Sequence, residues 1–295
     1  MRRGYAVVGL FATLLLAEVV LRWGVGLGDP PIAILDPELE YRLKPGVYHR
    51  WGNRIEINEI GLRGRPVVPE ALPGTRRVLL VGDSVVYGNH RLDQSETIAA
   101  GITAKANCPT ETISVAVSSW GPPNQAAFLA RHGTLNADAA VIVVSSHDLR
   151  DVPTNDPNIL PYRLRAPWTA IEDAATAVLE RIRLSSAMPQ HSGIDREAIA
   201  TAALDDMLLQ LRDAGIATTV IFHPTLSERE QLTSPRSAGR LAEMAKRRDA
   251  RFADASKAFD AEGAYQDNIH PNELGAARFA EMILDLLPCG LSRSP

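Results

Sequence analysis

The stretch RVLLVGDSVVYG, residues 77–88, decides the fold. Residues 78–81 are an unbroken apolar run, which is typical of a strand buried on both faces of a parallel sheet. Gly82 permits a sharp turn out of this strand. Because ligands bind beyond the carboxyl ends of the strands in open α/β sheets, Ser84 is the candidate nucleophile. We expect Asp83 to be structural.

A second segment, DNIHPN at residues 267–272, supplies a carboxylate and an imidazole three residues apart, just before a helical pattern. Serine is a poor nucleophile until a base takes its proton, and histidine suits that task near neutral pH. We expect Asp267 to orient Nδ1 of His270 and leave Nε2 facing Ser84. The alternative is a helix-capping turn with an incidental histidine.

Beyond residue 76, apolar runs alternate with helical patterns, which is typical of βαβ units and a parallel sheet. The expected strands are 77–81, 112–117, 139–145, 217–222 and 251–254. The expected helices are 95–106, 123–133, 196–214, 237–248 and 272–287. Five strands with covering helices predict a three-layer α/β/α sandwich. Residues 152–193 are predicted to be an insertion that either carries substrate contacts or covers the sheet.

Residues 1–23 predict a membrane segment. Arg2 and Arg3 precede an apolar run at 5–21, which is broken by Glu18 and followed by Trp23, in the order of a membrane span. We expect a retained inner-membrane anchor, with a cleaved signal peptide as the alternative. Either case places the remainder outside the cytoplasm, in the periplasm.

Residues 24–75 are rich in glycine and proline and predict an extended linker with short strands, one of them at 55–58. The main domain is then 76–290. With 45% hydrophobic and 22% charged residues, the chain is sufficient for one large α/β domain with a full core and a smaller appendage.

Charge and cysteine content exclude several classes of function. A net charge of −4, with dispersed Lys and Arg, disfavours nucleic-acid binding. The two cysteines, Cys108 and Cys289, exclude a disulfide scaffold and a cysteine-rich metal site. They leave open one long-range bridge or two unpaired thiols. We expect no metal and no cofactor.

The GDS of residues 82–84 with Gly88, and the DxxHP of residues 267–271, resemble the first and last motif blocks of the SGNH hydrolases, or GDSL esterases and lipases. The resemblance covers about residues 76–287. It implies a flavodoxin-like fold and hydrolysis of an ester through an acyl-enzyme. It also implies a catalytic triad of Ser84, Asp267 and His270. Residues 58–64, NEIGLRG, resemble a segment that precedes the domain in some exported members.

The middle blocks depart from the family pattern. A family glycine that holds the oxyanion aligns with Ser119, whose backbone N–H survives the exchange. The asparagine of a Gly-x-Asn-Asp block is replaced by His147, whose imidazole can also donate a hydrogen bond. The expected oxyanion hole therefore comprises Ser84, Ser119 and His147. The alternative for His147 is a histidine that merely lies beside Asp148.

Three further residues are predicted to contact the substrate: Trp120, Asn124 and His223. His223 follows the strand at 217–222 and so lies at the same edge as Ser84. The alternatives are a core position for Trp120 and a polar rim position for His223.

These observations favour a membrane-tethered serine esterase acting on an acyl ester, for example an O-acetyl group on an envelope or exported polysaccharide. An O-acyltransferase would use the same triad. A metal-dependent phosphoester hydrolase is a second class, with Asp83, His147, Asp148, His223 and His270 as ligands. A third is a non-catalytic envelope-assembly protein.

Overall fold

The computed structural model describes residues 2–184, 194–230, 236–260, 263–287 and 289. Residues 185–193, at the end of the expected insertion, and residue 290, at the end of the expected main domain, lie outside this description.

A five-stranded parallel sheet forms the centre of the domain, which confirms the predicted fold class. Its strands lie in the order β6 (Thr110–Ala116), β5 (Arg76–Gly82), β7 (Ala139–Val144), β8 (Ala217–Phe222) and β9 (Arg251–Asp254). This is the flavodoxin-like order 2-1-3-4-5, which reverses direction between β5 and β7. Every residue of these two strands is buried, which explains their apolar runs.

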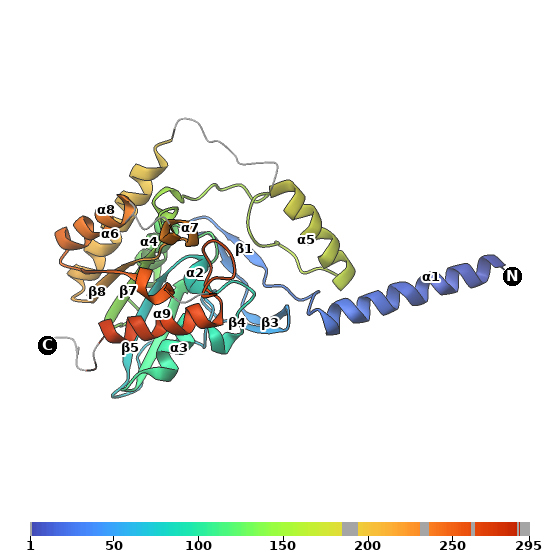
Figure 1. Cartoon of the computed structure of the whole chain (residues 1–295), viewed down its shortest axis with the longest axis horizontal. Helices are drawn as coiled ribbons and strands as arrows, with labels where there is room; N and C mark the ends of the chain where they lie inside the picture. Colours follow the sequence, from blue (N-terminus) through green and yellow to red (C-terminus); the bar gives the residue numbers. More distant parts are fainter. Residues whose placement is uncertain (1, 185–193, 231–235, 261–262, 288, 290–295) are drawn as a thin grey trace.

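Helices cover both faces of the sheet (Figure 1). On one face lie α3 (Ile98–Lys105) and α9 (Glu273–Leu286), and on the other α4 (Pro122–His132), α6 (Arg196–Asp213) and α8 (Arg236–Arg247). Most bounds agree with the predicted ones to within two residues. The exception is α3, because a 3₁₀ turn at Gln94–Glu96 precedes it and Thr97 caps it by accepting from the Ala100 amide. Shorter helical pieces are α2 (Ser84–Tyr87), α7 (Leu226–Glu230) and the 3₁₀ turns Asp148–Arg150 and Ala255–Phe259.

The expected linker contains short strands but packs as part of the domain. It forms two antiparallel hairpins, β1 (Ala33–Asp36) with β2 (Glu40–Leu43), and β3 (Gly46–Arg50) with β4 (Asn53–Ile57). Its apolar side chains at Leu39, Tyr41, Leu43, Ile55 and Leu62 are at most 1% exposed and belong to the main core. The sequence did not predict this packing, because glycine and proline indicate turns whether or not those turns pack against a core.

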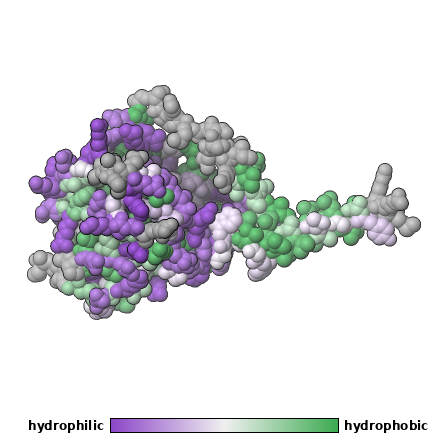
Figure 2. Space-filling model, viewed as in Figure 1, coloured by the Kyte–Doolittle hydropathy of each residue, from purple (hydrophilic) through white to green (hydrophobic). Residues whose placement is uncertain are grey.

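The N-terminal helix α1 (Arg2–Val19) continues into a π-helical turn at Val20–Gly24 and projects from the domain (Figure 1). Residues Tyr5–Gly24 have a mean hydropathy of 1.9, and their apolar surface is open (Figure 2). This helix is long and apolar enough to cross a membrane, as a signal sequence would also be.

The expected insertion contains a helix that the sequence reading did not predict, α5 (Ala170–Leu184). Its start contacts the end of α1, because the Glu18 carboxylate accepts hydrogen bonds from the amides of Ala170, at 2.9 Å, and Ile171, at 3.1 Å. A carboxylate at a helix N-terminus is favourable because it pairs with free N–H groups and the helix dipole. The described part of the insertion is therefore tied to the N-terminal helix.

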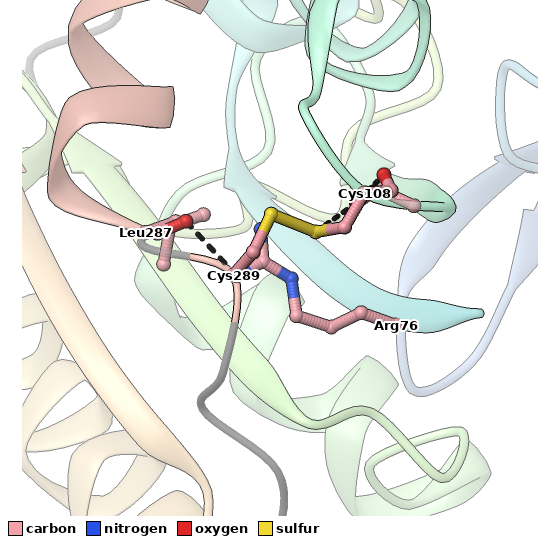
Figure 3. The surroundings of a disulfide bond; sticks show 5 residues. Arg76, Cys108, Leu287 and Cys289 are labelled. Carbon is pink, nitrogen blue, oxygen red and sulfur yellow. Dashed lines mark hydrogen bonds between the residues drawn. A yellow bond between two sulfur atoms is a disulfide. The ribbon is translucent and has the colours of Figure 1, made fainter. Parts of the chain in front are cut away.

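Cys108 and Cys289 form a disulfide that joins the loop before β6 to the chain just after α9 (Figure 3). The bridge settles the question that the sequence left open. Beside it, the Arg76 guanidinium donates to the Leu287 carbonyl at 2.9 Å. The C-terminal end of α9 is thus fixed by a covalent and a polar contact.

We expect Cys108→Ser with Cys289→Ser to lower the free energy of unfolding by about 2–4 kcal/mol, because a cross-link over a long loop restricts the unfolded chain. The sequence separation is 181 residues. Denaturant unfolding of the detergent-solubilised full chain, with and without reductant, measures this. An oxidised wild type whose midpoint does not move on reduction would contradict it.

Candidate active site

Ser84 lies where β5 turns into α2. Gly82 ends the strand, and a Cβ there would lie 2.5 Å from Cγ2 of Val86, so the turn requires glycine. Asp83 caps α2, since its Oδ1 accepts from the Val85 amide at 2.9 Å. Ser84 is the first residue of the helix and is therefore held at the carboxyl edge of the sheet, as predicted.

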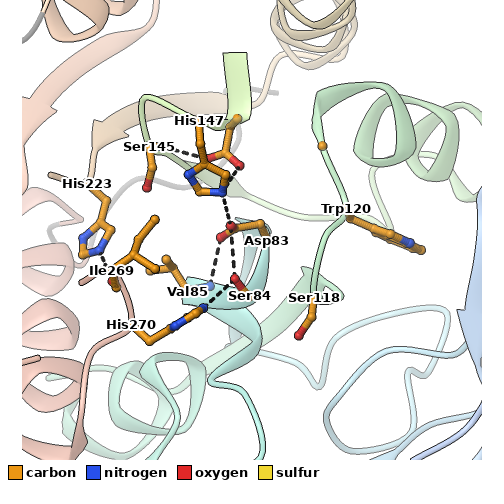
Figure 4. A network of polar contacts seen from close by, with 12 residues as sticks. Asp83, Ser84, Val85, Ser118, Trp120, Ser145, His147, His223, Ile269 and His270 are labelled. Atoms are coloured by element: carbon orange, nitrogen blue, oxygen red, sulfur yellow. Dashed lines mark hydrogen bonds and ion pairs between the residues drawn. The ribbon is translucent and has the colours of Figure 1, made fainter. Parts of the chain in front are cut away.

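His270 meets Ser84 at this edge (Figure 4), and Asp267 contacts the far side of the His270 ring. Nε2 of His270 lies 2.9 Å from Oγ of Ser84, and Nδ1 lies 2.7 Å from Oδ2 of Asp267. The structure therefore brings together the three residues of the expected triad, in the order that base catalysis requires.

The loop that carries Asp267 fixes the imidazole. Oδ1 of Asp267 accepts from the amides of Ile269 at 2.9 Å and His270 at 2.8 Å. Burial alone would raise the pKa of Asp267, but these hydrogen bonds and the imidazole lower it below its ordinary value. An ionised carboxylate on Nδ1 favours a proton at that nitrogen, which leaves Nε2 as the acceptor for Ser84.

His223 supports the same loop from inside the core. It has no exposed surface, and burial lowers its pKa to about 4, so the ring is neutral and Nε2 donates to the Ile269 carbonyl at 2.7 Å. Phe259 and Phe279 pack on the ring, with centroids 4.7 and 5.6 Å away. The prediction that His223 contacts the substrate is therefore wrong for this structure. His223 positions the segment that carries His270.

Trp120 and Asn124 are also buried, at 1% and 0% exposed. The Trp120 indole N–H donates to the Tyr41 carbonyl at 3.1 Å, and the Asn124 amide donates to the Leu39 carbonyl at 2.9 Å. These side chains leave no surface for a substrate, so their predicted role is also wrong. They instead anchor the 24–75 segment on the domain.

Ser119, the residue at the family's glycine position, has a φ of 62°. That left-handed conformation explains why glycine suits the position, and serine adopts it at a modest cost. Ser119 is exposed, and neither its amide nor that of Ser84 donates to another described residue. Both N–H groups are therefore available for the predicted oxyanion hole.

His147 lies at the same edge, after β7, but its Nε2 points at two carboxylates (Figure 4). It is 3.1 Å from Oδ2 of Asp83 and 3.3 Å from Oδ1 of Asp148. Burial alone would lower the pKa of His147, but Asp148 and Asp83, which face the ring, raise it to about 10. An oxyanion contact would therefore have to come from Nδ1.

The two carboxylates are 2% and 3% exposed. Burial alone would raise the pKa of Asp83, but the His147 cation and the Val85 amide lower it. Burial and the neighbouring Asp83 raise the pKa of Asp148 well above its ordinary value. One cation thus stabilises a buried pair of acids next to the nucleophile.

The predicted set of five metal ligands divides into separate groups. Ligand atoms of Asp83, His147 and Asp148 lie within 4.8 Å of one another and could hold a metal ion. His223 and His270 instead contact the Ile269 carbonyl and Ser84. In the described residues, the three clustered groups already pair with one another.

Arg63 is a residue of this region that the sequence reading did not single out. Its guanidinium donates to the carbonyls of Tyr87 at 3.0 Å, Asn89 at 2.8 Å and Leu92 at 2.8 Å. It therefore holds the loop that follows the nucleophile helix. The only sequence signal was its place in the 58–64 motif.

No protein-family model and no curated protein matches the sequence. Three matching solved structures are described as a G-D-S-L family lipolytic protein from Desulfitobacterium hafniense, the carbohydrate acetylesterase Est24 from Sinorhizobium meliloti, and the SGNH-hydrolase family esterase AlinE4. Their identities are 14%, 14% and 15%, with TM-scores of 0.46, 0.44 and 0.41. The matches cover 72%, 72% and 74% of this chain and 99%, 98% and 100% of the others.

We expect the protonated His147 to make stability depend on pH. Its folded pKa of about 10 lies above the ordinary value of 6.5. Its contribution is therefore complete below pH 6.5 and is lost as the pH rises toward 10. Urea midpoints of the wild type should fall across this window more steeply than those of His147→Asn. The exposed histidine variant His49→Asn should follow the wild type; parallel curves for all three proteins would contradict the assignment.

Proposed function

We propose that this protein is a serine esterase of the SGNH type that cleaves an acyl ester. The observation that carries the proposal is the alignment of Asp267, His270 and Ser84 through contacts of 2.7 and 2.9 Å at the carboxyl edge of the sheet. A nucleophile, a base and a residue that orients the base are the parts that acyl transfer requires.

The reaction would begin with attack of the Ser84 Oγ on the ester carbonyl carbon while Nε2 of His270 takes the hydroxyl proton. Collapse of the tetrahedral intermediate breaks the bond to the alcohol oxygen, which receives that proton. Water then attacks the acyl-enzyme, again losing a proton to His270. The carboxylic acid leaves as the proton returns to Ser84.

The oxyanion would be held by the amides of Ser84 and Ser119, which are free of other partners among the described residues. Nδ1 of His147 is a third candidate donor. The backbone N–H donors of Ser84 and Ser119 do not depend on the side chain at position 147. Exchange of the family's asparagine for His147 is therefore compatible with turnover.

We further propose that the ester is an O-acyl group, such as O-acetyl, on an envelope or exported carbohydrate. The apolar N-terminal helix and the long-range disulfide support an exported, membrane-anchored location, because disulfides persist in oxidising compartments. If a carbohydrate hydroxyl replaces water in the second step, the same residues perform O-acyl transfer.

We expect a fluorophosphonate probe to label Ser84 and to block hydrolysis of p-nitrophenyl acetate. Ser84→Ala should abolish labelling, and His270→Ala and Asp267→Asn should each lower kcat by about 10⁴-fold or more, as in other triads. Mass spectrometry of the labelled peptide and initial rates measure these effects.

A chelator distinguishes the alternatives. Hydrolysis that persists in EDTA together with Ser84 labelling supports the esterase. Loss of phosphoester hydrolysis in EDTA would favour metal chemistry at Asp83, His147 and Asp148. Absence of both labelling and turnover would favour the non-catalytic envelope-assembly protein.

We expect the full chain to remain in the membrane pellet after an alkaline carbonate wash, and a variant lacking residues 2–23 to be released. Residues 5–16 of α1 are all exposed, so their apolar side chains are open to lipid. The intact mass of the purified protein tests the alternative of a cleaved signal peptide, because cleavage would shorten the chain.

A further inference from the structure

A groove that the proposed mechanism does not use runs beside the catalytic loop. Its larger part, of about 460 Å³, is lined by Trp51, Asn53, Arg91 and Gln266. Arg91 and Gln266 also line an adjoining hollow of about 300 Å³ with Leu92, Asn272, Glu273 and Leu274. We call the two parts together the hairpin groove, because the β3–β4 hairpin forms one of its walls.

The hairpin groove adjoins both catalytic segments. Gln266 belongs to the loop of the base: its amide donates to the His270 carbonyl at 2.9 Å, and its side chain donates to the Pro271 carbonyl at 2.7 Å. Arg91 belongs to the loop after the nucleophile helix. Asn53 closes the gap to that loop by donating to the His90 carbonyl at 3.1 Å. A molecule in the groove would therefore lie next to the segments that carry Ser84 and His270.

Trp51 is an unusual residue for its position. It forms the two-residue turn between β3 and β4 with Gly52, and both residues have positive φ, 55° and 84°. Such turns strongly prefer asparagine, aspartate or glycine. A bulky residue with positive φ is strained, and such strain tends to occur at functional sites. The side chain is 47% exposed, so core packing does not account for it either.

The indole is held in place. The Arg50 guanidinium lies 5.1 Å from the ring centroid, as in a cation–π contact. Arg50 in turn pairs with the fully buried carboxylate of Asp173, which also accepts from the Gly28 amide at 2.7 Å. A pre-oriented side chain loses little freedom on binding. The aromatic ring therefore has the support expected of a binding surface.

The chemistry of the lining indicates its ligand. An exposed indole, three carboxamides, a guanidinium and the Glu273 carboxylate suit a sugar ring, which offers an apolar C–H face and a rim of hydroxyl groups. Arg91 is exposed and forms no ion pair with any described residue, so its donors are available. Apart from Leu92, which is 2% exposed, and Leu274, the lining is not aliphatic, which disfavours a long acyl chain.

We propose that the hairpin groove binds the glycan that carries the acyl ester, with Trp51 stacking on a sugar ring and Arg91 donating to its oxygens. This inference rests on the proposed esterase function. It assigns substrate selection to the segment before the main domain.

Trp51→Asn tests the proposal without threatening the fold, because asparagine is favoured in this turn. We expect its kcat/KM on O-acetylated xylan, divided by that on p-nitrophenyl acetate, to fall about tenfold, mainly through KM, in the full detergent-solubilised chain. Arg91→Gln should lower the same ratio. Trp168→Asn, at a tryptophan that is 85% exposed and lies outside the groove, should behave as the wild type.

Equal ratios for Trp51→Asn, Trp168→Asn and the wild type would overturn the inference while leaving the esterase intact. If the wild type hydrolyses neither ester, the proposed function fails, and binding decides the groove separately. Quenching of tryptophan fluorescence by O-acetylated xylan should then be present in Ser84→Ala and absent from Ser84→Ala with Trp51→Asn. Equal quenching in both would overturn the inference.

Discussion

The hydrogen bond between His270 and Ser84 joins residues 186 positions apart, and the remainder of the site depends on it. A parallel sheet makes this contact possible, because all strands end at one edge and every following loop begins there. The contact also needs α9 to stay in place. Asn272 caps its start by accepting from the Gly275 amide, and the Cys108–Cys289 disulfide holds the chain beyond its end.

The segment before the main domain acts as a brace for the nucleophile. The Arg63 guanidinium donates to three carbonyls at the end of α2 and in the loop that follows it. The Tyr41 hydroxyl donates to the Ser118 carbonyl, beside the expected oxyanion donor Ser119. In the opposite direction, the side chains of Trp120 and Asn124 in the main domain donate to carbonyl groups of the 24–75 segment. The two loops that would surround the reacting carbonyl are thus both held by residues outside the α/β unit.

The sequence predicted those features that follow from local pattern. Buried strands are marked by apolar runs, and Ser84, Asp267 and His270 stand in short motifs at strand or helix ends. The failures share one cause. A side chain such as His223 lies at the correct edge of the sheet, yet whether it faces the solvent or the core depends on Phe259 and Phe279, which come from distant parts of the chain. Pattern cannot supply that tertiary contact.

The charges around Ser84 explain why its hydroxyl group donates to His270 rather than to Asp83. Its Oγ lies 2.9 Å from Nε2 of His270 but also 3.3 Å from Oδ2 of Asp83, a second acceptor. The His147 cation and the Val85 amide both occupy Asp83, which makes that carboxylate a weaker acceptor than the imidazole. A neutral asparagine in place of His147 would leave two buried acids without a cation, at a high desolvation cost. The histidine at position 147 therefore does more than replace one hydrogen-bond donor with another. It places a positive charge on the side of Ser84 that lies opposite His270.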